Sequence, residues 1–422
     1  MNRRVFLKSG ALSLVTLGLS PSFLRRTAFA AELPMLARGK TLIVLFQRGA
    51  ADALNVVVPF GEAAYYRARP QLAIAAPTRG AGAAGAIDLD GFFGLHPSLA
   101  PFKPLWDRGM LAPVHAVGSP SSTRSHFDAQ DYMETGTPDR KGTTDGWLNR
   151  YLATQGTCEQ CVPGSTVPFR AVAMTAQTPR ILGGSAPTVA MNSIEEFSIR
   201  TNGGGSEQRI EALYRTGNAD LVHGSGAEMF EALKVLRAAN PQQYKAAAGV
   251  TYPRSPFGQH LLQLAQLIKS DVGLEVAFAD VGGWDTHVNQ GGAQGQLAAR
   301  LNDFSQSIAA LVTDLGDRMD DVVILTMSEF GRTVRQNGTG GTDHGHAGAM
   351  FVIGGSLKGA RTVHGKWPGL EPEQLNEGRD LALTTDFRSV FGEIASKHLG
   401  AKQLEKIFPG YGGREKEWLG VI

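Results

Sequence analysis

The chain has 422 residues, and its 41 Lys and Arg nearly balance its 39 Asp and Glu. This balance gives no electrostatic reason to bind nucleic acid or an anionic lipid surface, so neither is expected as a partner. Beyond the N-terminal region no segment is apolar enough to insert stably into a membrane.

The N-terminal residues, 1–30, predict a twin-arginine signal peptide. The pair Arg3 and Arg4 precedes a weakly apolar stretch at 11–24, which is shorter than the about 20 residues that a membrane span needs. A small-x-small cleavage motif follows at 28–30. We expect cleavage after this motif and export by the twin-arginine translocase, so that the protein is periplasmic or secreted. The alternative is an uncleaved amphipathic first helix.

The two cysteines, Cys158 and Cys161, are separated by two residues in a polar loop. A Cys-x-x-Cys pair can be redox-active, or hold zinc as part of a set of four. This pair stands alone, so a local disulfide formed after export is the favoured interpretation.

In chain order, the first half of the mature sequence predicts two buried strands, each a continuous apolar run: 41–47 and 111–117. A helix is predicted between them at 98–108. After the second strand a capped helix begins near residues 122–125, because Ser is favoured at a helix N-terminus. A further strand is expected at 170–174.

The second half predicts a helical cap or insertion near 203–255, followed by alternating helices and strands. The helices are expected at 257–269 and 294–317, and the strands at 274–279, 322–327 and 349–353. Such alternation predicts one α/β domain over 31–422, with a doubly wound, mostly parallel sheet and helices on both faces. Ligands of such sheets bind beyond the carboxyl ends of the strands.

Polar residues cluster just after the predicted strand ends. They are Asp52, Ser125, His126, Asp285, His287, Glu329, Asp343 and His344, with His346 beside them. Carboxylate and imidazole groups together form a ligand set for a divalent metal, with Zn, Mg, Ca and Mn all open. Two such ions would polarise a phosphoryl or sulfuryl oxygen and stabilise the attacking and leaving groups. Ser125 lies in the first turn of a helix, where an anion is favoured.

Some of these residues also have a structural interpretation. Ser125 could simply cap its helix. Asp285 and His287 could belong to a turn held by the Asp side chain. Glu329 could form an ordinary surface ion pair with Arg332.

Six segments together make the chain recognisable. They are the leader and residues 46–55, 124–127, 282–287, 328–333 and 340–345. In these segments the sequence resembles the domain-of-unknown-function family fifteen-oh-one, exported bacterial proteins placed in the alkaline phosphatase and sulfatase superfamily. The resemblance covers essentially the whole mature chain.

The resemblance implies an alkaline phosphatase/sulfatase-like fold and a site position. The superfamily nucleophile would fall at Ser125, or failing that at Thr123, and a metal-binding Asp and His at Asp285 and His287, with shorter spacing. The superfamily's late Asp-His pair would fall at Glu329 and Phe330. Because phenylalanine cannot bind metal, either His344 supplies the imidazole or only one metal binds. No formylglycine signature of standard sulfatases is present.

We therefore predict an exported, metal-dependent hydrolase of phosphate or sulfate esters, acting on a small-molecule or polymer substrate. Ser125 and His126 are the catalytic candidates. Asp52, Asp285, His287, Glu329, Asp343 and His344 are the candidate metal ligands. The alternative is a catalytically silent envelope protein that keeps the fold and binds a polymer or a partner protein.

Overall fold

The computed structural model describes residues 39–78, 85–155, 169–195, 235–236, 244–411 and 415–422. The predicted signal peptide at 1–30, both cysteines and most of the predicted helical insertion near 203–255 lie outside these ranges. No helix within them is long and apolar enough to cross a membrane.

The centre of the molecule is an eight-stranded sheet in the order β11-β5-β10-β9-β1-β8-β6-β7. The strands are β1 (Thr41–Gln47), β5 (Leu111–Gly118), β6 (Ala171–Met174), β7 (Val189–Ala190), β8 (Val276–Val281), β9 (Val322–Met327), β10 (Gly348–Gly354) and β11 (Thr385–Asp386). Every neighbouring pair is parallel except the two that involve β10. The predicted mostly parallel sheet is confirmed.

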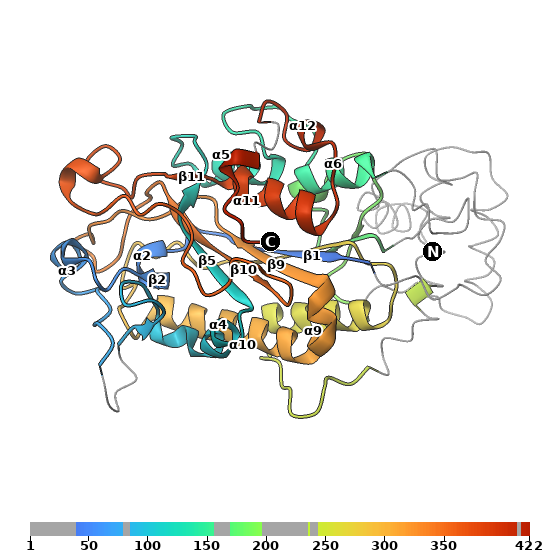
Figure 1. The fold of residues 1–422 in the computed structure, drawn as a ribbon, viewed down its shortest axis with the longest axis horizontal. Helices are drawn as coiled ribbons and strands as arrows, with labels where there is room; N and C mark the ends of the chain where they lie inside the picture. The colour runs from blue at the N-terminus through green and yellow to red at the C-terminus, as the bar shows by residue number, and fades with distance from the viewer. Residues whose placement is uncertain (1–38, 79–84, 156–168, 196–234, 237–243, 412–414) are drawn as a thin grey trace, which may run out of the picture.

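Helices cover both faces of this sheet, as the sequence predicted (Figure 1). One face carries α4 (Lys103–Asp107), α9 (Pro256–Lys269) and α10 (Gln296–Leu315), and the other carries α5 (His126–Thr135), α6 (Trp147–Thr154), α11 (Phe387–Glu393) and α12 (Leu404–Ile407).

Short elements complete the described chain. A second sheet has the order β2-β4-β3, formed by β2 (Val57–Val58), β3 (Ile87–Asp88) and β4 (Gly94–Leu95). The short helices are α2 (Ala53–Val56), α3 (Ala63–Ala68), η2 (Pro97–Phe102), η3 (Arg180–Leu182), η5 (Gly316–Asp321), η6 (Pro372–Gln374), η7 (Ile394–His398) and η8 (Glu415–Glu417).

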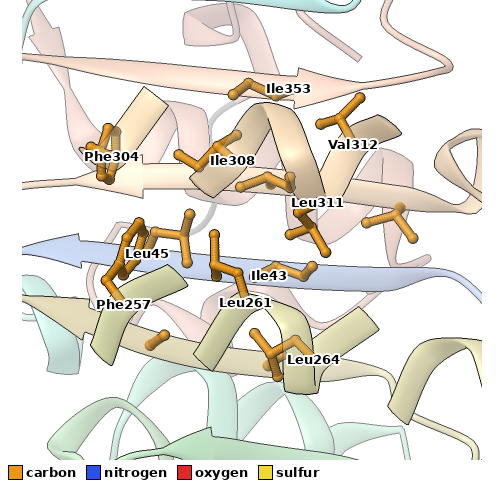
Figure 2. Packing of buried hydrophobic residues seen from close by; sticks show 14 of the residues in the cluster. Ile43, Leu45, Phe257, Leu261, Leu264, Phe304, Ile308, Leu311, Val312 and Ile353 are labelled. Atoms are coloured by element: carbon orange, nitrogen blue, oxygen red, sulfur yellow. The ribbon is translucent and has the colours of Figure 1, made fainter. Parts of the chain in front are cut away.

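Strand β1 shows why the central strands read as continuous apolar runs. Successive side chains of a strand point to opposite faces of a sheet. Ile43 and Leu45 belong to the cluster that packs under α9 and α10 (Figure 2), whereas Val44 and Phe46 belong to the cluster on the other face. All four side chains are fully buried, so both faces demand apolar residues.

The antiparallel strand β10 was predicted as a strand, but its orientation was not. A parallel neighbour needs a crossover that returns the chain to the other end of the sheet. Here the chain leaves β9 and re-enters as β10 through a loop, residues 328–347, that remains at one edge. This loop carries several of the predicted site residues.

Most predicted element ends fall within two residues of the observed ones. The predicted helix at 98–108 is divided between η2 and α4, with Pro101 inside the first of them. The predicted strand at 274–279 is shifted to Val276–Val281. Helices α6 and α11 were not predicted.

Two neighbouring leucines of α9 test the contribution of this core. Leu261 is fully buried against the sheet, whereas Leu262 is partly exposed. Leu261→Ala should lower the free energy of unfolding by about 2–5 kcal/mol, because it removes buried methyl groups and leaves a cavity. Urea denaturation followed by circular dichroism measures this, with Leu262→Ala as the matched control. An equal loss in both variants would contradict the described packing.

Candidate metal centre

One edge of the sheet gathers the loops that carry the candidate residues. Strands β1, β5, β8 and β9 point the same way, so their carboxyl ends lie at this edge, where β10 begins. Asp285 and His287 follow β8, and the loop between β9 and β10 carries Glu329 and His344. Helix α5, which follows β5, begins with His126. The predicted convergence of distant segments is therefore what the structure shows.

His126, Asp285 and His344 form a group whose potential ligand atoms all lie within 4.8 Å of one another. Nε2 of His126 lies 3.0 Å from Nε2 of His344 and 3.5 Å from Oδ2 of Asp285. Nε2 of His344 lies 3.2 Å from Oδ1 of Asp285. Two ligands of one tetrahedral zinc ion, each bonded at 2.0–2.1 Å, lie about 3.3 Å apart. The spacing of these three groups therefore fits a single small divalent cation.

His287 adjoins this group. Its Nε2 lies 3.0 Å from Nε2 of His344 and 2.9 Å from Oδ1 of Asp285. The structure thus brings Asp285, His287 and His344 together, as the sequence predicted, and adds His126, which the sequence analysis treated as catalytic.

The three histidines share one orientation, because each Nδ1 faces an oxygen that only accepts hydrogen bonds. His126 faces Glu329 at 2.7 Å, His287 faces Asp343 at 2.8 Å, and His344 faces the Arg124 carbonyl at 2.9 Å. Each Nδ1 therefore carries the proton and donates it, which leaves the Nε2 lone pair free in the neutral ring. A histidine that binds metal is held by an oxygen on its other nitrogen in the same way.

The convergence of these lone pairs tests whether the site suits a cation. Nε2 of His344 faces two other Nε2 atoms at 3.0 Å, and a neutral imidazole with its proton on Nδ1 has no Nε2 proton to share with either. Electron pairs so close to each other and to a carboxylate repel unless a proton or a metal cation lies among them. The donor set therefore fits a divalent cation and forms a candidate metal site.

Glu329 lies behind this site. Its carboxylate is fully buried, and Oε1 accepts hydrogen bonds from His126, Gln130 and the Gly49 backbone. Burial by itself would raise the pKa of Glu329, but the hydrogen bonds from His126 and Gln130 outweigh it and keep the pKa below its usual value. With Oε1 so occupied, Glu329 orients His126 and is not a member of the ligand group. The alternative ion pair with Arg332 is not formed.

Arg332 pairs with Asp285 instead. The guanidinium is fully buried and donates from Nη1 to Oδ1 of Asp285 at 2.6 Å. Burial alone would raise the pKa of Asp285, yet the hydrogen bond and charge of Arg332 hold it below its ordinary value. Asp285 is therefore an anion at neutral pH, as a metal ligand must be.

The two histidines of the group differ in how readily they take a proton. The hydrogen bond to Glu329 raises the pKa of His126, against the effect of burial. Burial lowers the pKa of His344, and the nearby positive charges of His126 and Arg332 lower it further.

Phe330, which cannot bind metal, stacks on the His126 ring with centroids 5.0 Å apart. His344, and not Phe330, is a member of the ligand group.

Asp343 resembles Glu329 in its position. Its Oδ1 accepts from Nδ1 of His287 and from Asn337, and the bond from His287 lowers the pKa of Asp343. In this structure Asp343 orients His287 instead of joining the ligand group.

Asp52 is placed differently from its prediction. Its side chain is buried, and its two oxygens accept from Arg69 at 2.6 and 2.9 Å and from Gln290 at 2.6 Å. It is not in the ligand group. The sequence does not distinguish one carboxylate that follows a strand from another. In the structure the buried Arg69, 17 residues away, forms an ion pair with Asp52.

Ser125 is the N-cap of α5, as its structural interpretation proposed. Its Oγ accepts from the Asp128 backbone at 3.5 Å, and the residue is exposed. Among the described residues, no hydrogen bond joins the Ser125 hydroxyl to any of the three histidines.

Sequence reasoning missed Gln130, Arg332 and Gly49. Gly49 has φ of +120°, and a Cβ there would lie 2.6 Å from the Asp285 backbone nitrogen. Only glycine therefore lets the loop after β1 lie against the loop that carries Asp285. Arg332 was noted only as a partner for Glu329.

The model of the family described as "Protein of unknown function (DUF1501)" matches residues 108–408. The chain belongs to this family. No curated protein is significantly similar to it.

Two solved structures show distant likenesses. The PsFucS1 sulfatase from Pseudoalteromonas sp. is 13% identical, with a TM-score of 0.38, over 87% of this chain and 68% of that chain. A protein in the alkaline phosphatase superfamily from Vibrio parahaemolyticus is 12% identical, with a TM-score of 0.33, over 85% and 71%. Likenesses this distant do not assign an activity.

Removal of a proposed ligand tests the metal site directly. His344→Ala should weaken binding of Zn²⁺ or Mn²⁺ at least about 100-fold, because losing a ligand costs more than losing a partner behind one. His346→Ala is the matched control, since its Nε2 contacts the Ser119 and Ser121 carbonyls instead. Metal content of the folded variants is measured by mass spectrometry of the eluted ions. Equal metal content in His344→Ala and wild type would refute the site.

Acid should release the metal, because a protonated imidazole cannot bind it. The raised pKa of His126 means that protons compete at a higher pH than for an ordinary histidine. Glu329→Gln removes the group that raises this pKa, so the pKa of His126 in the metal-stripped protein should fall. NMR titration of the His126 ring measures this pKa in both proteins. An unchanged or higher pKa of His126 in the variant would contradict the arrangement.

Proposed function

We propose that this protein is an exported, divalent-metal-dependent hydrolase of phosphate or sulfate esters. The observation that carries the proposal is the convergence of three Nε2 lone pairs on Asp285, with an oxygen holding each Nδ1. His126, Asp285 and His344 would hold the ion. A bound divalent cation would act as a Lewis acid on an ester oxygen.

The residues around this group keep it ready to bind. Glu329 fixes the tautomer and the ring plane of His126, and Arg332 fixes the carboxylate of Asp285. The side chains of Asp285 and His287 are 42% and 39% exposed, so solvent and substrate can reach the group from one side. An open side is typical of catalytic metal sites and distinguishes them from closed structural ones.

Two exposed apolar residues directly follow histidines of the site in the sequence. Phe127, which follows His126, is 89% exposed, and Val288, which follows His287, is 51% exposed. We assign them to the organic part of the ester.

Ser125 is the proposed nucleophile. It is exposed, it directly precedes His126, and its cap contact of 3.5 Å lies at the limit of a hydrogen bond. Attack by its hydroxyl would release the alcohol and leave an ester on Ser125, which water then hydrolyses.

Export is proposed from the signal at 1–30, with the twin-arginine translocase as the partner that carries the folded protein across the membrane. Periplasmic or secreted placement follows from the same signal.

An assay panel tests the proposed activity. Metal-stripped protein is given Zn²⁺, Mn²⁺, Mg²⁺ or Ca²⁺ and assayed with 4-nitrophenyl phosphate, bis(4-nitrophenyl) phosphate and 4-nitrophenyl sulfate. We expect metal-dependent hydrolysis of at least one ester, which His344→Ala abolishes. Ser125→Ala should lower kcat about 10³-fold or more, whereas Ser122→Ala, an exposed serine of the same loop, should not change it.

The outcomes separate the alternatives. Normal activity in Ser125→Ala would make water the nucleophile. Normal metal binding without hydrolysis of any ester would reject the enzyme and favour the catalytically silent envelope-binding protein.

A further inference from the structure

A cavity of about 460 Å³ lies beside the candidate metal centre. Its lining includes Asp343, which accepts a hydrogen bond from His287 at 2.8 Å. It also includes Arg379, which donates to the His344 carbonyl at 2.9 Å. Two residues of the cavity lining therefore form hydrogen bonds directly with His287 and His344 of the site.

Three arginines line this cavity, and none of them is held in a close, buried ion pair. Arg335 is exposed, and no acceptor engages its guanidinium among the described residues. Arg67 pairs with Glu371, but both side chains are exposed, at 59% and 44%. Exposed ion pairs contribute little, so Arg67 can exchange its partner at small cost. Arg379 approaches Asp380 only to 3.4 Å.

The charges in the lining favour an anion. Its two carboxylates are already engaged, Glu371 by Arg67 and Asp343 by His287. Three arginines against two carboxylates leave one positive charge in excess in this lining. A planar guanidinium donates two parallel hydrogen bonds to a carboxylate, a phosphate or a sulfate, which makes arginine the residue suited to these groups.

We propose that this cavity binds a second, non-reacting anionic group of the substrate. The preferred substrate would then carry a carboxylate, phosphate or sulfate in addition to the ester that is cleaved. The anion site stands on the cavity alone, whereas its role toward a substrate rests on the proposed function.

Arginine labelling tests the anion site without any activity. Metal-stripped protein is treated with phenylglyoxal in phosphate or in chloride of equal ionic strength, and the labelled peptides are quantified by mass spectrometry. Phosphate should slow labelling of Arg335. It should not protect Arg254, an exposed arginine outside the cavity whose side chain likewise has no partner among the described residues. Equal labelling of Arg335 in both salts, or equal protection of both arginines, would overturn the proposal.

Kinetics then test the role toward substrate. Arg335→Gln should raise KM about tenfold for at least one of 2-, 3- and 4-carboxyphenyl phosphate, through loss of a charged hydrogen bond, and leave KM for phenyl phosphate unchanged. Arg254→Gln should change neither. Unchanged KM for all carboxylated esters would refute the role. Protection of Arg335 without hydrolysis of any ester would refute the proposed function and leave the anion site standing.

Discussion

The arrangement of this edge of the sheet depends on one constraint, the fixed proton on Nδ1 of three histidines. Glu329, Asp343 and a backbone carbonyl each take that proton, so three Nε2 lone pairs point toward Asp285. Without a proton or a metal cation among them such an array is repulsive, and with a metal cation it is a ligand set. The buried Glu329 and Arg332 hold His126 and Asp285 in this arrangement. Each of these two partners is itself fixed by further hydrogen bonds.

The support extends from the site into the interior. Asp52, paired with Arg69, also accepts from Gln290 at 2.6 Å. Gln290 in turn accepts from Thr342 at 2.7 Å, and Arg332 donates to Thr342 at 3.2 Å and to Asp285 at 2.6 Å. A continuous chain of polar contacts thus joins a buried ion pair to the exposed carboxylate of the site. Buried networks of this kind are rigid when every member is satisfied.

The antiparallel orientation of β10 in a mostly parallel sheet determines where the site lies. A regular crossover after β9 would have carried the chain away from the carboxyl edge. Because β10 is antiparallel, the loop between the two strands stays at that edge and provides Glu329, Arg332, Asp343 and His344. The loop after β8 adds Asp285 and His287, and Gly49 lets the loop after β1 lie against it. The arginine-lined cavity adjoins the same polar group through Asp343 and Arg379.

The sequence alone determined the mostly parallel sheet, because strands such as β1 are buried on both faces and must be apolar throughout. It also indicated which polar residues gather, since chemistry in such sheets lies beyond the strand ends. Only the tertiary structure decided which of these residues can bind a metal and which of them pair with other residues. Asp52 and Glu329 both follow a strand in the sequence. In the structure Asp52 pairs with Arg69, whereas Glu329 accepts a hydrogen bond from His126. Whether a carboxylate or an imidazole keeps a lone pair for a metal depends on the partner of its other atoms, and that partner comes from distant parts of the chain.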